Sequence, residues 1–297
     1  MTEGEPTSVA GTIRELGVSG IVGSGPTGLL TRYTEITRSG IHVAAAAADV
    51  AATEALLHAG PSLASREGGP YQWEPLLYLA YARHDPAVSE AAILATARLL
   101  LDAGADPNAG YLWHGLTTPF TVLTGALGSG EGDQPEHPHA FALASLLLAA
   151  GADPNDGQAL YSRQFGGDDR HLVLLLSRGL GRGDGGPWRA RLGHAMDSPA
   201  DLVRGQLWWA IVHDTRDRVR LLVEHGADFL SAFWTPGGRP SGYRTSHGRT
   251  PAGVAALARC PELVDWLPAG RDERRRGAAG AGPGPEHRPR RASRVRF

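Results

Sequence analysis

The amino-acid sequence predicts an all-α protein made of repeated helix pairs. One phrase, an apolar run that closes on Gly-Ala-Asp, recurs along the chain, most clearly at 99–108, 146–155 and 221–228. Gly and Pro together form about a fifth of the chain, so it must turn often. With 42% hydrophobic residues it can still bury a core. A phrase that recurs in this way is typical of repeat proteins, in which each copy belongs to one structural unit.

Each unit is expected to end at the glycine of this phrase. Helices commonly close on a glycine in the left-handed conformation, which is unfavourable for other residues. In two copies Ala-Asp-Pro-Asn follows, and Pro cannot continue a helix because it lacks an amide hydrogen and disfavours helical geometry in the preceding residue. With weaker copies included, about six units are predicted. They end near Gly60, Gly104, Gly151, Gly179, Gly226 and Gly270.

Helix starts precede these ends. Thr250-Pro251 offers a Thr N-cap followed by Pro at the first helical position. Similar starts are predicted at Thr118-Pro119, Glu74-Pro75 and Gly40-Ile41. A unit therefore consists of a turn, a first helix, a short connection, a second helix and a turn that ends on Gly. The stretch 158–179 departs furthest from this pattern, and we expect a helix pair there without an intervening loop.

These units resemble the ankyrin-repeat family. Residues 248–251 match the helix start of the family, both Gly-Ala-Asp-Pro-Asn copies match its unit end, and His42 matches its histidine. The resemblance covers roughly residues 39–270 and implies a solenoid of stacked helix pairs with projecting loops and a concave face. Family units have about 33 residues, so the additional residues of most units here are expected in long loops such as 128–139. The resemblance implies a non-catalytic scaffold that binds another protein.

The two ends of the chain differ from the region of repeats. Residues 1–38 carry only weak helical signals and are expected to cap the first repeat or to be partly disordered. Residues 271–297 contain nine Arg and three acidic residues without hydrophobic periodicity, so a basic disordered tail is predicted. Such a tail favours at most weak contact with nucleic acid, or contact with the acidic body of the protein itself. The net charge of −2 argues against nucleic-acid binding over the whole surface.

Composition also predicts the compartment. The chain begins without the basic and apolar regions of a secretory signal, and it has no run of 18 apolar residues that could span a membrane. Cys260 is the single cysteine, which excludes a disulfide scaffold. All 29 basic residues are Arg. We therefore expect a cytoplasmic protein that does not contact membranes.

The alternative function is a dinucleotide- or metal-binding enzyme. Residues 23–28 have the Gly-x-Gly-x-x-Gly spacing of dinucleotide-binding loops, and Asp49 follows at about the distance of the ribose-binding acid. The residues before this motif make a poor central strand, however, and Asp49 follows five Ala residues, which favour a helix. We therefore expect no bound cofactor.

Two polar stretches offer other chemistry. Residues 131–139 contain His137, His139 and three acidic residues, a weak metal-ligand set whose alternative is a solvated insertion. Residues 168–171 place two carboxylates beside His171, which is a pattern compatible with acid–base catalysis. The same carboxylates also suit a helix start, where negative charge is favourable. We expect neither a metal nor a catalytic residue.

Aromatic residues in the loops are the candidate protein-binding site. Trp, Tyr and Arg are enriched among the residues that dominate binding energy, and in an ankyrin-like array these loops would face a partner. The candidates are Tyr71, Trp73, Tyr111, Trp113, His114, Trp188, Arg189, Phe233, Trp234, Arg239, Tyr243 and Arg244. Trp113 and Trp234 are the first choices. In the alternative, these rings pack over their own loops.

Overall fold

A computed structural model describes residues 36–83, 88–115, 118–128 and 135–227. Within these ranges the chain is mostly helical, and its strands form one two-stranded ribbon. The predicted all-α class is confirmed in this broad form, with the ribbon as the exception. Residues 1–35, the unit that would end at Gly270 and the predicted tail lie outside the described residues.

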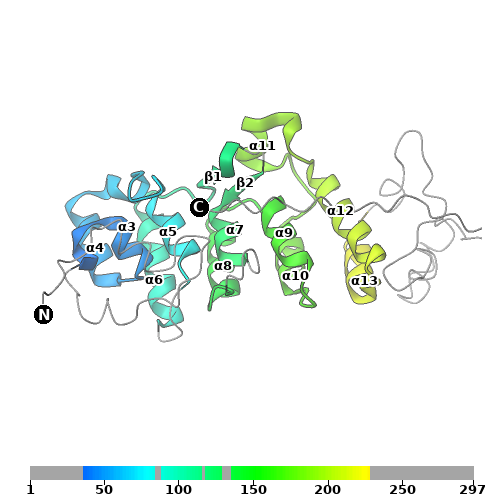
Figure 1. Cartoon of the computed structure of the whole chain (residues 1–297), viewed down its shortest axis with the longest axis horizontal. Coiled ribbons are helices and arrows are strands. Elements are labelled where there is room, and N and C mark those ends of the chain that lie inside the picture. Colours follow the sequence, from blue (N-terminus) through cyan, green and yellow to red (C-terminus); the bar gives the residue numbers. More distant parts are fainter. Residues whose placement is uncertain (1–35, 84–87, 116–117, 129–134, 228–297) are drawn as a thin grey trace, which may run out of the picture.

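The helices follow one another in pairs that are joined by turns and longer connections (Figure 1). They are α3 (Ile41–Ala46), α4 (Val50–Ala59), α5 (Pro75–Tyr81), α6 (Glu90–Asp102), α7 (Val122–Leu127), α8 (Ala140–Ala149), α9 (Gly157–Gln164), α10 (Arg170–Ser177), α11 (Gly186–Leu192), α12 (Pro199–Val212) and α13 (Arg216–Glu224). The short 3-10 helices are η1 (Ile36–Ser39), η2 (Pro61–Ser65), η3 (Trp113–Gly115) and η5 (Gly193–Ala195).

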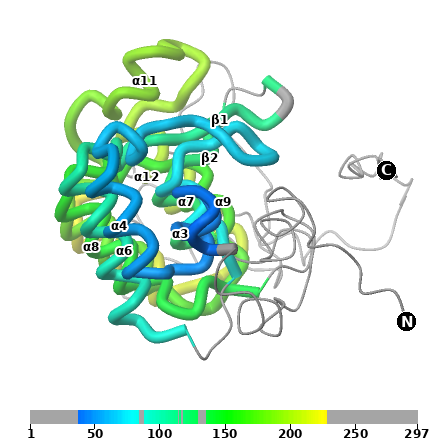
Figure 2. The backbone as a smooth tube through the Cα atoms, turned by 90° about the vertical axis from the view of Figure 1, so that its left-hand side faces the viewer, coloured from blue at the N-terminus to red at the C-terminus, as the bar shows by residue number. Residues whose placement is uncertain are grey.

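The pairs lie side by side along the longest axis of the molecule. The first helices of the pairs contact one another in the order α3, α5, α7, α9 and α12, and we call them the first-helix row. The second helices α4, α6 and α8 contact one another in the same way. Figure 2 views the molecule along this axis and shows α4, α6 and α8 on one side and α3, α7 and α9 on the other. Each helix pair thus covers the apolar faces of its neighbours.

The hydrophobic core runs between the two rows as one continuous cluster. Leu79, Leu123, Leu160 and Leu207 are buried in four successive pairs. Burial of one such side chain contributes about 1.5–3 kcal/mol to the free energy of unfolding. In α3 the buried side chains are mostly Ala, and their small size lets α3 approach α5 closely. Stability is therefore distributed along the row.

The predicted glycine ends are confirmed at four of the units. Gly104, Gly151, Gly179 and Gly226 have φ values of 99°, 104°, 104° and 81°, which lie in the left-handed region. Gly60 differs, because its φ of −165° is extended backbone. Pro61 explains the difference: a residue that precedes Pro is restricted to extended conformations.

One predicted helix start was wrong. Glu74-Pro75 begins α5 and Gly40 precedes α3, as expected. Pro119–Thr121, in contrast, forms strand β2, which pairs antiparallel with β1 (Gly110–Leu112). Helix α7 begins only at Val122, where the Thr121 side chain accepts a hydrogen bond from the Thr124 amide. The capping Thr is therefore the second Thr of this segment, because the first Thr precedes a strand.

The stretch 158–179 forms the expected helix pair, α9 and α10, joined by a short connection. A longer connection, 178–198, follows it and contains α11, which projects at the top of Figure 1. In the described part of the chain, no helix is long and apolar enough to cross a bilayer.

Candidate protein-binding surface

Two successive loops on one side of the molecule carry the first predicted aromatic residues. The first loop joins η2 to α5 and is closed by an antiparallel bridge between Gly68 and Trp73. Tyr78 of α5 holds this loop, because its hydroxyl donates to the Gly68 carbonyl (2.8 Å) and accepts from the Tyr71 amide (3.1 Å). The second loop is the β1–β2 ribbon, in which Tyr111 is paired with Phe120.

Rings from both loops form one continuous row, which we call the loop aromatic row. Its members, in order, are Tyr71, Trp73, Tyr111, Phe120 and Trp113. The successive ring centroids are 4.8, 4.6, 5.5 and 6.2 Å apart. These distances lie in the range in which aromatic pairs attract each other beyond simple burial. Phe120 was missed by the sequence analysis, which placed it in a helix.

Exposure differs greatly along the row. Trp73 is buried with 9% of its surface exposed, whereas Trp113 is 47% exposed. Tyr71, Tyr111 and Phe120 are half-buried. Trp73 therefore packs within the molecule, as the alternative interpretation of the loop aromatics expected, and Trp113 presents its ring outward. His114 follows in η3, with only its backbone described.

Trp188 and Arg189 lie in α11 rather than in a loop. Trp188 is 8% exposed, and its indole N–H donates to the Asn108 carbonyl at 2.9 Å. The Arg191 guanidinium covers the ring at 4.5 Å from its centroid. Arg189 donates to the Asp184 carbonyl at 3.0 Å. Trp188 thus fastens the long connection to a loop that is distant in sequence. The five remaining candidates, Phe233, Trp234, Arg239, Tyr243 and Arg244, lie outside the described residues.

Glu74, the residue after Trp73, interacts electrostatically with two other carboxylates, and we call the three the acidic group: Glu67, Glu74 and Asp106. Burial, together with the nearby negative charges of Asp106 and Glu67, raises the pKa of Glu74 to about 7. Glu74 precedes α5 but does not cap it. Its Oε2 atom is buried and has no hydrogen-bond partner within the described structure. Burial without a hydrogen-bond partner is unfavourable for a charged carboxylate, which agrees with the raised pKa of Glu74.

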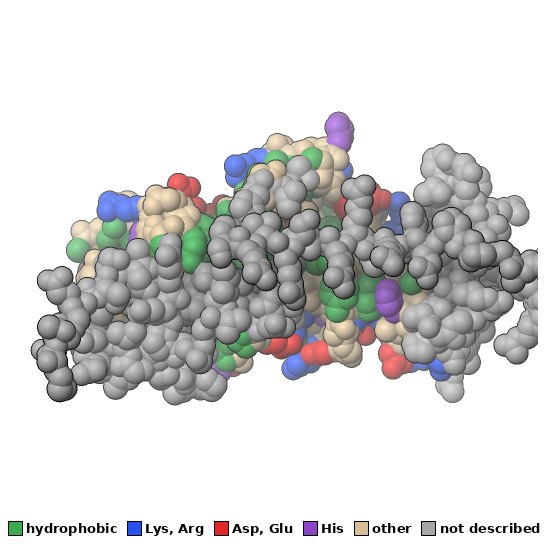
Figure 3. Space-filling view, in the orientation of Figure 1, with side chains coloured by type: hydrophobic (Ala, Val, Ile, Leu, Met, Phe, Trp, Pro, Cys, Tyr) green, Lys and Arg blue, Asp and Glu red, His purple; other side chains and the backbone are tan. Residues whose placement is uncertain are grey.

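A second aromatic group, missed by the sequence analysis, lies on the first-helix row. Tyr161 and Phe165 of α9 are 48% and 62% exposed, and Phe165 contacts Trp209 of α12 edge to face at 6.1 Å. His213 stacks on Trp209 at 3.9 Å. Hydrophobic atoms reach the surface at the position of α9 and α12 in Figure 3. Only the four-residue spacing of Tyr161 and Phe165, which places both rings on one helix face, could have indicated this group.

The residues that the alternative, enzymatic function would use make contacts that hold the fold together, wherever the structure describes them. Asp49 caps α4: its carboxylate accepts from the Ala52 amide (3.0 Å) and from the Thr37 hydroxyl (2.6 Å). His139 lies 3.1 Å from the Val88 carbonyl, and its main-chain amide donates to His137. Across the described ranges, no three His, Cys, Asp or Glu side chains are placed to hold a metal ion. The Gly-rich residues 23–28 lie outside these ranges.

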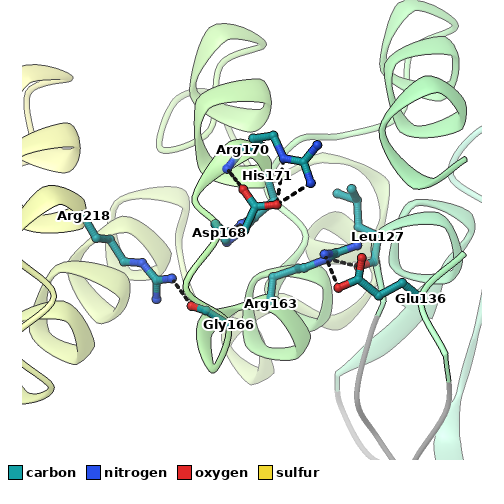
Figure 4. Close-up of polar contacts among 8 residues, drawn as sticks. All are labelled: Leu127, Glu136, Arg163, Gly166, Asp168, Arg170, His171 and Arg218. Carbon is teal, nitrogen blue, oxygen red and sulfur yellow. Dashed lines mark hydrogen bonds and ion pairs between the residues drawn. The ribbon is translucent and has the colours of Figure 1, made fainter. Parts of the chain in front are cut away.

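The stretch 168–171 begins α10, as the helix-start interpretation predicted. Figure 4 shows Asp168 paired with Arg170, at 2.6 Å between Oδ2 and Nη2. His171 is fully buried, with Nδ1 3.0 Å from the Asp168 carbonyl. Burial, with the charges of Arg218 and Arg163, lowers the pKa of His171 to about 4. The imidazole is therefore neutral at physiological pH and packs in the interior.

Buried arginines cap the ends of first helices, a role that sequence analysis did not assign. Arg163 of α9 donates to the Leu127 carbonyl at the end of α7 and pairs with Glu136 at 2.9 Å (Figure 4). Arg218 of α13 donates to the carbonyls of Gln164, the last residue of α9, and of Gly166 just beyond it, at 2.7 and 2.9 Å. We call these residues the capping arginines. They satisfy carbonyl groups that lack a partner inside their own helix.

No protein-family model matches the chain, and no curated protein is significantly similar to it.

Proposed function

We propose that this chain is a cytoplasmic, non-catalytic ankyrin-repeat scaffold that binds another protein through the loop aromatic row. The observation that carries the proposal is Trp113, an aromatic side chain that is 47% exposed at the end of a row of packed rings. A large ring held by packed neighbours loses little conformational entropy on binding. Such rings are the usual centres of binding energy in protein interfaces.

Repeated contacts between loops support the ankyrin-like array. Asn108 donates to the Gly151 carbonyl (3.0 Å) and accepts from the Asp153 amide (2.8 Å). One unit later Asn155 accepts the equivalent bond, from the Gly181 amide (2.8 Å), while its side-chain amide donates to the Arg182 carbonyl (3.1 Å). The bond from the second residue after the unit-ending glycine to an Asn of the preceding unit, present in both places, favours a true repeat rather than a chance succession of helices.

The first unit supports the same proposal. His42 of α3, the residue that matches the histidine of the family, lies 2.8 Å from the Arg66 carbonyl in the loop that precedes α5. Its ring contacts Tyr78 edge to face at 5.5 Å. A side chain of one first helix thus positions the loop that leads to the next one. Loops that are held in this way can present side chains to a partner without a large ordering penalty.

The test compares two aromatic rings of matched exposure on different surfaces. A partner recovered by affinity capture with the full chain is titrated against the Trp113→Ala and Tyr161→Ala proteins. Trp113→Ala is expected to weaken binding by about 2 kcal/mol, the value for a central interface ring, with little change in thermal stability. Tyr161→Ala, whose ring is 48% exposed on α9, is expected to bind as the parent does. Unchanged binding by Trp113→Ala, or loss of binding only in Tyr161→Ala, would refute the assignment of the loop aromatic row.

A further inference from the structure

We infer that Trp188 is a positioning residue for the proposed binding site, because it packs on the β1–β2 ribbon and holds that ribbon in the conformation that presents Trp113. The inference rests on the proposed function and identifies a residue, distant in sequence, on which binding depends. Two observations carry it: the indole lies against the ribbon on the face opposite the loop aromatic row, and it is the buried anchor of the connection that contains it.

The two faces of the ribbon have different neighbours. Successive side chains of a strand point to opposite faces. Tyr111 and its cross-strand partner Phe120 share one face, where their ring centroids are 5.5 Å apart. Gly110 and its partner Thr121 belong to the other face. A Cβ atom at Gly110 would lie 3.0 Å from Cζ2 of Trp188, so the indole packs against this second face.

A ribbon of this size depends on packing against both faces. Each strand has three residues, and an isolated two-stranded ribbon is at best marginally stable in water. On the second face the indole adds its ring and donates a hydrogen bond of 2.9 Å to the Asn108 carbonyl, in the loop before β1. Trp113 follows β1 directly, and its ring centroid lies 6.2 Å from that of Phe120 in β2. Its position therefore depends on the order of the ribbon.

Trp188 in turn anchors the connection 178–198 (Figure 1). The start of this connection is bonded to Asn155. From residue 183 to 198, all of which the structure describes, Trp188 is the only buried hydrophobic side chain. Several glycines of this stretch have positive φ, and glycine loses more conformational freedom on ordering than any other residue. Docking of the connection on the ribbon therefore depends on the contacts of one indole.

The docked and undocked states should differ in their affinity for a partner. With the indole docked, the ribbon is packed on both faces and presents Trp113 with a small ordering penalty. With the indole undocked, the partner must first order the ribbon, so the apparent affinity falls with the docked fraction. An autoinhibitory role fits less well, because the indole lies on the face opposite Tyr111 and Phe120.

Hydrogen–deuterium exchange of the full chain, measured by mass spectrometry, tests the effect on the ribbon without a partner. Trp188→Ala should accelerate exchange of the β1 and β2 amides about tenfold, because a hydrogen bond and its packing are lost, while the α9 amides keep their rates. Trp188→Phe keeps a buried ring and removes only the N–H donor. It should accelerate exchange in the ribbon by about threefold.

A matched control variant separates this role from a general loss of stability. Leu57 of α4 is 7% exposed, close to the 8% of Trp188. Leu57→Ala should accelerate exchange in α4 and leave the ribbon unchanged, because the stability of a repeat array depends on contacts between neighbours. Unchanged exchange of the ribbon in Trp188→Ala, or equal acceleration in the ribbon and α9, would overturn the inference.

The captured partner tests the effect on binding. Trp188→Ala should weaken its binding about threefold to tenfold. Added to Trp113→Ala, the same substitution should cause little further loss, because Trp188 acts through Trp113. If the partner depends on Trp113 but binds Trp188→Ala as tightly as the parent or more tightly, the inference fails and the proposed function stands. If the partner is indifferent to Trp113, the proposed function itself fails, whereas exchange of the ribbon still decides whether Trp188 orders it.

Discussion

At the scale of single residues, the glycines that close the units are required by their backbone conformation rather than by crowding. Gly104 and Gly151 have φ values of 99° and 104°, and a Cβ atom at either position would meet no atom within 4 Å. An added side chain therefore has room but is forced into the left-handed region. The penalty for a substitution is confined to backbone strain, which is about 1–2 kcal/mol for a residue with a Cβ.

The same substitution is expected to have different effects on stability at two glycines. Gly151→Ala should lower the free energy of unfolding by about 1 kcal/mol, because Ala is held at positive φ. Gly167→Ala should leave it unchanged or slightly raised, because that position is equally open and lacks a positive φ. Denaturant unfolding of both proteins checks the prediction. Equal midpoints for the two variants would contradict it.

The glycine ends could be predicted because they depend on a few adjacent residues. Burial of the aromatic residues could not, because it depends on which loops become neighbours in space. Trp73 and Trp113 both lie in connections between helices, yet one is buried beneath Tyr71 and Tyr111 while the other is exposed. Sequence analysis therefore found most members of the loop aromatic row but could not tell which ring is accessible.

At the scale of secondary-structure elements, the capping arginines connect helices of neighbouring pairs. Arg218 of α13 is 1% exposed, donates to the last carbonyl of α9 and to one in the connection after it, and pairs with Asp169 at the start of α10. The C-terminal end of a helix carries partial negative charge, and Asp169 is an anion, so one guanidinium serves three acceptors on two helices. The geometry depends on the planar fork of Arg as well as on its charge.

A charge-conserving substitution is therefore expected to destabilise the protein at this position. Arg218→Lys should lower the free energy of unfolding by about 1–3 kcal/mol, because a single ammonium cannot reach all three acceptors. Arg220→Lys on the same helix is the control, since its side chain is 39% exposed and pairs with the exposed Asp217. It should change stability by less than about 0.5 kcal/mol. Similar thermal midpoints for both variants would show that charge alone matters at Arg218.

The elements differ in how far sequence predicts them. The helix starts at Glu74-Pro75 and Asp169 depend on adjacent residues in the sequence and were predicted correctly. The β1–β2 ribbon was missed because Thr118-Pro119 matches a helix start when viewed alone. Residues 119–121 form a strand only because they pair with β1, where Leu112 lies opposite Pro119. Similarly, the capping arginines could not be predicted, because their acceptors lie in other units.

At the scale of the whole molecule, half-buried Glu74 and buried His171 lie in different units and affect the free energy of unfolding in opposite directions. Glu74 has a pKa of about 7 in the folded chain, above its ordinary value of 4.5, because the folded chain favours its protonated form. Its contribution to the free energy of unfolding is therefore complete below pH 4.5 and is lost as the pH rises through 7. His171 has a pKa of about 4, below its ordinary value of 6.5, so its contribution is complete above pH 6.5 and is lost as the pH falls through 4. Between pH 4.5 and 6.5, a rise in pH therefore lowers the stability contributed by Glu74 and raises the stability contributed by His171.

Removing the Glu74 carboxylate should reveal how strongly His171 makes stability depend on pH. The Glu74→Gln protein is expected to gain about 2 kcal/mol of stability between pH 4.5 and 6.5, because the contribution of His171 remains while the opposing contribution of Glu74 is removed. The parent should gain about 1 kcal/mol less, since solvent screening weakens the contribution of half-buried Glu74. The measurement is the free energy of unfolding in denaturant across this pH range. Identical profiles for the two proteins would show that Glu74 does not titrate as described.

The contact between Trp188 and Asn108 has a mechanical consequence. Trp188 lies in the connection that follows α10. Its indole N–H nevertheless donates to Asn108, in the loop that precedes β1 and α7. This contact, which we call the strap, thus joins the segments on either side of the helix pairs α7–α8 and α9–α10. A pulling force along the longest axis would have to break this strap before those pairs could separate. We expect the helix pairs from α7 to α10 to resist such a force more strongly than the other described helix pairs.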